Sequence, residues 1–299
     1  MRVGSGTPLA QPPALAASQE RPVLALRGVW VRLFALMLLL NCLPVRSAEP
    51  ESQGPEPDGP AAQPVYSGRP GLGSDIKAYF TAPLHWSGAD WAAFGAVLAA
   101  VGVAHHYDAQ VRDHFVSASA AGDTSDLKDA LPTVAVLGGT WAYAALVDSA
   151  AGRSETWDMV EAAGLGSVSA YAVKFASGRQ GPDQTSDPNE WGKGQGSFPS
   201  WHTTAAFAVG TVLAESGNDE FRWVRRAIGY GLGSITAYER LKHNAHWLSD
   251  VVAGAALGAA SARFVLVRRY EAQSALGAHI EVSPAPGGGL MLSYSRSLD

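Results

Sequence analysis

Cysteine is nearly absent from this 299-residue sequence, which contains only Cys42. A single thiol cannot form a disulfide within the chain, so the sequence excludes a small scaffold held together by cystines. A lipid anchor on this thiol would need a small residue just before it, and Asn41 fits that requirement poorly.

Charged residues are scarce too, at 16% of the chain, and acidic residues outnumber basic ones to give a net charge of -5. Lysine and arginine are scattered, so the sequence lacks the basic patch that nucleic-acid binding requires, and we predict no nucleic-acid partner. Hydrophobic residues make up 47% of the chain, which is enough for a large core and argues against a disordered protein.

Long uninterrupted apolar runs are also missing. The existing runs fall short of the roughly 18–20 residues that a membrane span needs, and they are rich in alanine and glycine. They lie at 92–104, 131–147, 203–214, 227–238 and 251–267, the last interrupted by Arg263. We interpret them as buried core helices and leave a peripheral membrane contact open.

The N-terminal region has the pattern of a secretory signal. Arg27 and Arg32 precede the apolar run 33–40, and the small residues Ser47 and Ala48 follow it. Positive charge, a short apolar segment and a small-residue end are typical of an export signal. We expect cleavage near Ser47 or Ala48 and a mature protein that is periplasmic or secreted, with membrane association left open.

Composition divides the chain into four segments. Residues 1–48 form an N-terminal extension and signal peptide, and residues 49–73 form a linker rich in proline and glycine. Residues 74–272 form a helical domain, and residues 273–299 alternate in the way that predicts a short β-hairpin tail packed on the helical body.

Within the helical domain, apolar spacing and breaker residues predict a series of helices. Their expected ranges are 75–82, 89–104, 129–149, 154–176, 203–215, 221–238 and 246–270. The predicted fold class is therefore all-α, a helical bundle with a short C-terminal β-hairpin.

The segment from Arg240 to Asp250 has the most constrained chemistry. Asn244 is a plausible N-cap for a helix that starts near Ala245, which would place His246 and Asp250 on one face. The Asp250 carboxylate can then accept from one ring nitrogen of His246 and leave the other as a nucleophile. Arg240 can fold back to bind an anion through its planar guanidinium.

Two further segments supply groups that bind anions. Ser200, the amide of Trp201 and His202 open a helix, where unpaired N–H groups and the helix dipole favour negative charge. Lys174 and Arg179 supply cations near the end of an earlier helix. Histidines, a carboxylate, cations and a helix N-terminus together suit phosphoryl transfer.

Each feature also has a simpler interpretation. Ser200 can be only a helix cap, and the cations can be solvated. His246 and Asp250 can be a surface pair or, with His243, part of a metal site. No second cluster completes such a site, so we predict no metal and no other cofactor. We assign no function to three histidines expected at loops or helix ends, which are His105, His106 and His114.

In combination, these segments resemble the type-2 phosphatidic acid phosphatase and vanadium haloperoxidase superfamily, in particular its bacterial, acid-phosphatase-like members. The family pattern is Lys, six residues, Arg-Pro; then Pro-Ser-Gly-His; then Ser-Arg, five residues, His, three residues, Asp. The matching positions are Lys174 and Pro182; Pro199, Ser200 and His202; and Arg240, His246 and Asp250. Three positions depart from the pattern, namely Gly181 for Arg, Trp201 for Gly and Glu239 for Ser.

The resemblance implies a helical bundle and a metal-independent phosphatase that acts on phosphomonoesters or on lipid phosphates and diphosphates. By the family's pattern, His246 attacks phosphorus to give a phosphohistidine, Asp250 orients it and His202 protonates the leaving group. The implied phosphate-binding groups are Lys174, Ser200, the amide of Trp201 and Arg240.

Two alternatives stay open beside the phosphatase. Losing an arginine at position 181 removes a charged contact, and we hypothesise that Arg179 swings in to replace it. A vanadate-dependent haloperoxidase would use the same anion-binding residues. A catalytically weak relative that only binds phosphate is the other alternative.

Overall fold

The computed structural model of the chain describes residues 71–118, 126–193, 196–217, 221–276, 278–284 and 290–296. Side chains are described up to residue 272, except for those of residues 117–129 and of the gaps already named. The chain divides into Met1–Glu49 and Pro50–Asp299, and every described residue belongs to the second unit. The predicted signal peptide, its cleavage site and most of the linker lie outside the described residues.

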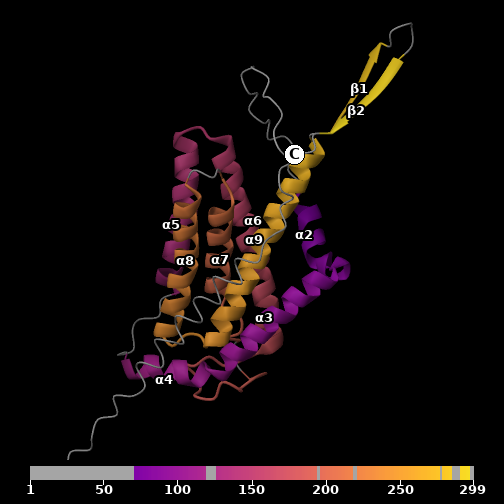
Figure 1. Cartoon of the computed structure of the whole chain (residues 1–299). Helices are drawn as coiled ribbons and strands as arrows, with labels where there is room; N and C mark the ends of the chain where they lie inside the picture. Colours follow the sequence, from indigo (N-terminus) through magenta and orange to yellow (C-terminus); the bar gives the residue numbers. More distant parts are fainter. Residues whose placement is uncertain are drawn as a thin grey trace, which may run out of the picture. The chain divides into compact units, whose positions relative to one another are not determined.

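The described part of the chain is mainly helical, which confirms the all-α class for this part (Figure 1). The helices are α2 (Leu72–Thr81), η1 (Ala82–His85), α3 (Gly88–His106), α4 (Asp108–Ala118), α5 (Asp126–Leu146), α6 (Ala150–Ser177), α7 (Trp201–Glu215), α8 (Arg222–Lys242) and α9 (Leu248–Leu276). After them, β1 (Ala278–Pro284) runs antiparallel to β2 (Leu290–Arg296). With side chains described only to residue 272, the predicted hairpin tail and its packing on the helices stay a prediction.

Each predicted helix has a counterpart whose ends differ by a few residues, but α4 was not predicted. Within this mostly polar stretch, the buried apolar residues are Val111 and Phe115. Two apolar positions are too few to predict a helix from their spacing. The structure accordingly places His114 within α4, whereas His105 and His106 form the last turn of α3.

The start of α9 also differs from the prediction. The helix begins at Leu248, and Asn244 is in the left-handed conformation with φ 55° instead of capping a helix. The Asp250 side chain reaches back to accept from the backbone N–H of Trp247, at 2.9 Å. This is one half of a capping box, so Asp250 starts the helix from inside its first turn.

The helix α7 is the centre of the bundle and packs against α6, α8 and α9 (Figure 1). Glycines allow the close approach: a Cβ atom added to Gly210 or Gly229 would overlap the other residue's carbonyl oxygen. On the opposite side of α7, a Cβ atom on Gly258 would overlap the carbonyl oxygen of Thr204. Small residues at these crossings let the backbones touch, as in membrane helix pairs.

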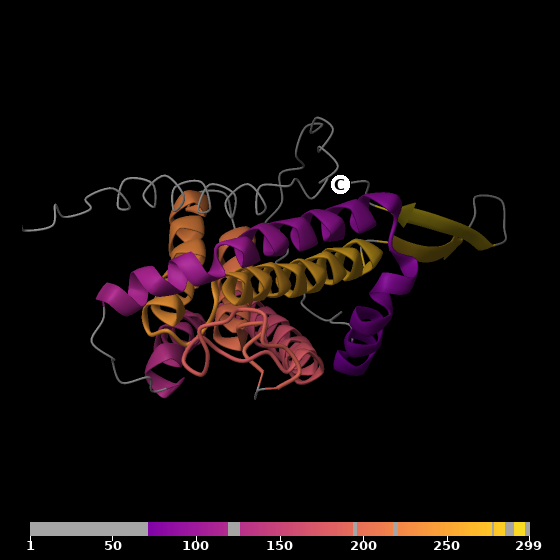
Figure 2. The ribbon, with the colours of Figure 1, turned by 90° about the horizontal axis from the view of Figure 1, so that it is seen from below.

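The helix α3 runs alongside α9 but is mostly exposed (Figure 2). Its exposed apolar side chains include Trp91 (51%), Leu98 (55%) and Val103 (50%). The interpretation of runs 92–104 and 131–147 as buried core helices is therefore wrong, because Leu131 (54%), Trp141 (59%) and Leu146 (87%) on α5 are exposed as well. The helix α7 is buried as expected. Among the described helices, α3 and α9 are long and apolar enough to cross a membrane.

Candidate active site

The residues singled out from the sequence gather where α6 and α8 end and α7 and α9 begin. Lys174 lies in the last turn of α6 and Arg240 in the last turn of α8. Ser200 caps α7, and its backbone N–H donates to the carbonyl oxygen of Asp250 in the first turn of α9, at 3.0 Å. The positive ends of two helix dipoles and two cations therefore meet at one end of the bundle, an arrangement that favours an anion.

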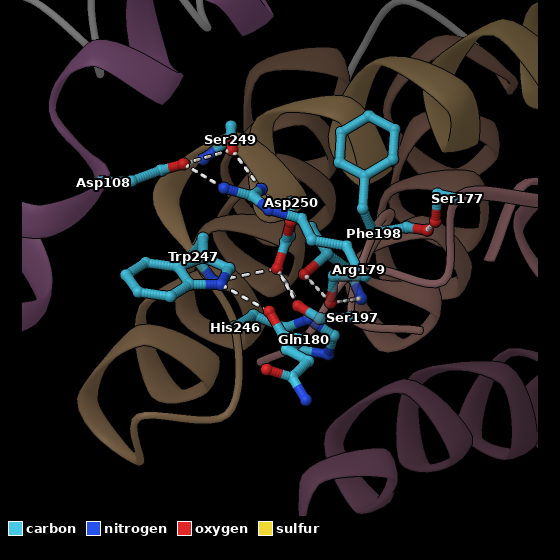
Figure 3. Close-up of polar contacts among 12 residues, drawn as sticks. Asp108, Ser177, Arg179, Gln180, Ser197, Phe198, His246, Trp247, Ser249 and Asp250 are labelled. Atoms are coloured by element: carbon cyan, nitrogen blue, oxygen red, sulfur yellow. Dashed lines mark hydrogen bonds and ion pairs between the residues drawn. The ribbon is translucent and has the colours of Figure 1, made fainter. Parts of the chain in front are cut away.

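The Asp250 carboxylate is fully buried and surrounded by donors (Figure 3). Its Oδ1 accepts from Nη1 of Arg179 at 2.6 Å. Its Oδ2 accepts from the Ser197 hydroxyl and from the Trp247 backbone N–H. Hydrogen bonds from charged and neutral donors on both oxygens favour the ionised form and fix its orientation.

His246 lies just before α9, not on it, and only 5% of it is exposed. Its Nδ1 is 3.4 Å from Oδ2 of Asp250, a long contact of the kind that can tighten when substrate binds. The two side chains meet because Asp250 reaches back over the start of the helix. The sequence predicted the contact between them, but it placed both residues on one helix face, and His246 is not on the helix. With the proton on Nδ1 facing this carboxylate, Nε2 carries the lone pair.

Burial lowers the pKa of His246 below its ordinary value of about 6.5. The positive charges of Arg240 and Lys174 lower this pKa further, whereas Asp250 acts in the opposite direction. Both cations thus lie within electrostatic reach of the imidazole, and at neutral pH the ring is neutral, as a nucleophile must be.

The segment at the start of α7 presents a second histidine. His202 is buried, and the Trp201 ring lies against its imidazole with 3.9 Å between centroids. Trp201 also stacks on Tyr171 of α6, and Lys174 Nζ lies 5.9 Å from the Tyr171 ring centroid. These contacts link His202, through aromatic rings, to Lys174.

Trp201 stands where the family pattern has glycine, and the backbone tolerates the replacement. As the first residue of α7 it has helical geometry, and among the described residues other than glycine only Asp148 and Asn244 have positive φ. The Trp201 amide therefore keeps its place at the helix N-terminus without strain.

Ser200 acts as a cap in the structure. Its Oγ accepts from the Thr203 hydroxyl at 3.0 Å and from the Thr203 backbone N–H at 3.5 Å. Since Oγ is the acceptor in both contacts, its own proton can still be donated to an anion. Capping and phosphate binding are compatible roles for this residue.

Arg179 does not occupy the position that the sequence suggested. It is fully buried, and its guanidinium donates to Asp250, Asp108 and Ser249, each at 2.6–2.7 Å. Its Nε and Nη2 also donate to the Pro188 carbonyl oxygen, at 3.1 Å and 2.8 Å. This arrangement disagrees with a role in phosphate binding, because every nitrogen of the group is already engaged by protein.

At Gly181 the chain lacks the arginine that the family pattern has among its phosphate-binding cations. A Cβ atom there would lie 3.6 Å from the carbonyl oxygen of Ala245, the residue before His246, and would overlap the exposed Asp183 carboxylate unless that side chain moved. A side chain at this position would thus extend beside the nucleophile's backbone, and in this chain it is missing.

Asp108, Ser249, Ser197 and His105 belong to the site's polar network but had no role in the sequence analysis. Ser197 lies just before the segment of Ser200 and His202 that the sequence analysis singled out, and Ser249 precedes Asp250, a predicted catalytic residue. Asp108 carried no sequence signal, because the partners that tie it to the site, Arg179 and Ser249, are 71 and 141 residues away along the chain. Within the described ranges, no group of three or more histidine, cysteine or acidic side chains is placed to hold a metal ion.

Residues 155–273 match the family model described as the PAP2 superfamily. The chain is also 35% identical over 112 residues to a lipid A 1-phosphatase of Porphyromonas gingivalis. That match covers 36% of this chain but only 23% of the relative's length. No solved structure matches the chain significantly. The matched region runs from α6 to α9 and includes Lys174, His202, Arg240, His246 and Asp250, but excludes α3 and α4.

Proposed function

We propose that this chain, whose residues 155–273 match the PAP2 superfamily model, is a phosphatase that hydrolyses lipid phosphates through a phosphohistidine intermediate. The single observation that carries the proposal is the buried pair of His246 and Asp250, at 3.4 Å, within electrostatic reach of the cations Lys174 and Arg240. A neutral imidazole held by a carboxylate in a positive environment is arranged to attack an anionic phosphorus centre.

In the proposed first step, Nε2 of His246 attacks phosphorus while the bond from phosphorus to the leaving oxygen breaks. His202 gives a proton to that oxygen, and Asp250 stabilises the positive charge that develops on His246. Lys174, Arg240, the Ser200 hydroxyl and the Trp201 amide bind the phosphoryl oxygens.

In the second step, water attacks the phosphohistidine. His202 takes the proton from this water, the phosphorus–nitrogen bond breaks, and its electron pair returns to Nε2 of His246. Inorganic phosphate leaves, and both histidines regain their starting protonation states. Apart from the substrate and one water molecule, these steps use groups of this chain.

Several observations support a lipid substrate. The candidate spans α3 and α9 both have an end at the site: α9 begins there, and His105 at the end of α3 lies 2.9 Å from Asp108. A site at the end of two such helices would face the depth at which lipid phosphates lie. The relative's name also refers to a lipid phosphatase. Exposed aromatic rings next to Lys174, Tyr171 (42%) and Phe175 (84%), offer apolar contact beside the site.

The test is phosphate release by the full chain in detergent, without added metal, compared with His246→Ala. The substrates are an aryl phosphate, a phosphatidic acid, a polyprenyl diphosphate and lipid A. His85→Ala is the matched control, because His85 is exposed on η1 and outside the site. We expect phosphate release by the parent chain and by His85→Ala, with acid-labile phosphate trapped on both, and neither release nor trapping with His246→Ala.

If the parent chain releases no phosphate from any of these substrates, the proposal is contradicted, and a protein that only binds phosphate is favoured. Gly181 and the engagement of Arg179 are the features that would account for that outcome. If His246→Ala is as active as the parent chain, the phosphohistidine mechanism is rejected, but the proposed phosphatase activity stands.

A further inference from the structure

The starting observation is a buried carboxylate outside the region that the family model matches. Asp108 is the first residue of α4 and has no exposed surface. Its Oδ1 accepts from the Ser249 backbone N–H at 2.8 Å, and its Oδ2 accepts from the Ser249 hydroxyl at 2.7 Å. Ser249 is the neighbour of Asp250, so Asp108 holds the first turn of α9 from the side of α4.

Arg179 connects this carboxylate to the one that orients the nucleophile. Its Nη2 donates to Asp108 at 2.7 Å and its Nη1 to Asp250 at 2.6 Å, so one guanidinium bridges two buried carboxylates (Figure 3). The guanidinium also lies over the Trp191 ring at 4.6 Å and over the Trp247 ring at 5.5 Å. Its orientation is therefore set by partners on several elements.

The geometry of the group makes the two contacts interdependent. A guanidinium is planar and rigid, so the nitrogen that bonds Asp108 determines where the nitrogen that bonds Asp250 can lie. Removing one carboxylate leaves the buried arginine with an unmatched charge and allows it to turn toward the other. Any such turn would move Asp250, whose Oδ2 faces Nδ1 of His246.

We propose that Asp108 and Arg179 are positioning residues, which hold Asp250 so that the His246 proton stays on Nδ1 and Nε2 stays aimed at phosphorus. The proposal rests on the phosphohistidine mechanism proposed above. It assigns Arg179 to the nucleophile's support and not to the phosphate. It also brings α4, and through His105 the end of α3, into the catalytic apparatus.

The two roles of Arg179 predict different kinetics. A residue that binds phosphate contributes to the affinity for substrate and for phosphate mimics, so its loss raises both KM and the inhibition constant for vanadate. A residue that only positions the nucleophile contributes mainly to kcat. A displacement of the nucleophile by about 1 Å can cost on the order of 10²-fold in rate.

The experiment compares Asp108→Asn and Arg179→Lys with the parent chain in the same detergent. Asp158→Asn is the matched control, because it breaks a largely buried carboxylate–arginine pair, with Arg269, that joins α6 to α9. We expect Asp108→Asn and Arg179→Lys to lower kcat by on the order of 10²-fold. KM and the vanadate inhibition constant should change by less than about threefold, and the control should keep its kcat.

A tenfold rise of the vanadate constant in Arg179→Lys would overturn the proposal in favour of direct phosphate binding. Equal losses of kcat in Asp158→Asn would also overturn it, since they would show a general loss of structure. A double variant, Asp108→Asn with Asp250→Asn, should be no slower than Asp250→Asn alone, and additive losses would contradict a shared pathway.

A readout that needs no turnover separates this proposal from the proposed function. In a chain labelled with ¹⁵N-histidine, the His246 resonances are identified by their loss in His246→Ala. We expect one tautomer with the proton on Nδ1 in the parent chain and a mixture of tautomers in Asp108→Asn. An unchanged His246 spectrum in Asp108→Asn would overturn the positioning role, whether or not the chain releases phosphate.

Discussion

At the scale of single residues, Gly181 is the departure from the family pattern with the clearest chemical consequence. The position lies beside the backbone that carries His246, and its φ is not in the left-handed region, so a larger residue fits the backbone. The atom that an added Cβ atom would overlap belongs to the exposed carboxylate of Asp183, which can move.

We therefore predict that Gly181→Arg tightens phosphate binding. A hydrogen bond to a charged group contributes about 1.5–3 kcal/mol, so we expect the inhibition constant for phosphate to fall by at least about tenfold. Gln184→Arg adds the same charge on an exposed turn nearby and controls for general attraction. Equal inhibition constants for both variants would show that position 181 does not reach the phosphate.

The lowered pKa of His246 predicts the pH dependence of activity. Since burial holds this pKa below about 6.5, the neutral nucleophile persists into mildly acidic solution. We expect the decline of kcat/KM on the acid side, where the nucleophile becomes protonated, to lie below about pH 6.5. A decline centred at or above pH 6.5 would show that another group, or an unperturbed histidine, controls the rate.

The same shift has a consequence for stability. Between the lowered pKa of folded His246 and about 6.5, the unfolded chain binds a proton that the folded chain does not. The free energy of unfolding therefore rises with pH across this window, and His246→Ala should weaken that rise.

At the scale of secondary-structure elements, α8 crosses α7 at direct backbone contact. Gly229 faces Gly210 on α7, whereas Gly231, two residues further along α8, has nothing within 4 Å of an added Cβ atom. The same helix thus offers a tight and an open glycine for comparison.

We predict opposite effects of alanine at these two positions. Gly229→Ala must push apart two backbones and should lower the free energy of unfolding by about 1–3 kcal/mol. Gly231→Ala fills open space and improves helix propensity, so it should raise that free energy by about 0.5–1 kcal/mol. Thermal unfolding in one detergent measures both, and equal shifts would contradict the packing described here.

At the scale of the whole molecule, many large apolar side chains of the described part are exposed, because its own helices do not cover them. Most of them lie on α2, α3, α5, α6 and α8, and the α3 side chains Phe94 and Leu98 are 41% and 55% exposed. With about 1.5 Å per residue, the 19 residues of α3 extend about 28 Å, close to the thickness of a bilayer's hydrocarbon core. We infer that α3 lies in a membrane.

This inference predicts the behaviour of a charged variant. Lysine at both Phe94 and Leu98 should reduce the fraction of the protein that floats with phospholipid vesicles by on the order of tenfold, because a charge in hydrocarbon costs about 2.5–3.5 kcal/mol. Gln110→Lys, on exposed polar surface of α4, should float like the parent chain. Flotation of the double variant at parent levels would contradict membrane contact by α3.

The sequence alone determined the features that depend on near neighbours. Apolar spacing predicted the helices from α5 to α9, and short motifs predicted that Lys174, His202, Arg240, His246 and Asp250 share a site. Such patterns are visible because a helix repeats every few residues and a helix end needs a cap within one turn.

Only the tertiary structure decided the partners that come from far along the chain. The bridge from Arg179 joins Asp108 and Asp250, each 71 residues away, and no local pattern connects them. The exposure of α3 has the same cause, since burial depends on which helices pack together and not on the apolar content of one of them. A contact between distant segments exists only once the chain has folded, and a single sequence carries no periodic trace of it.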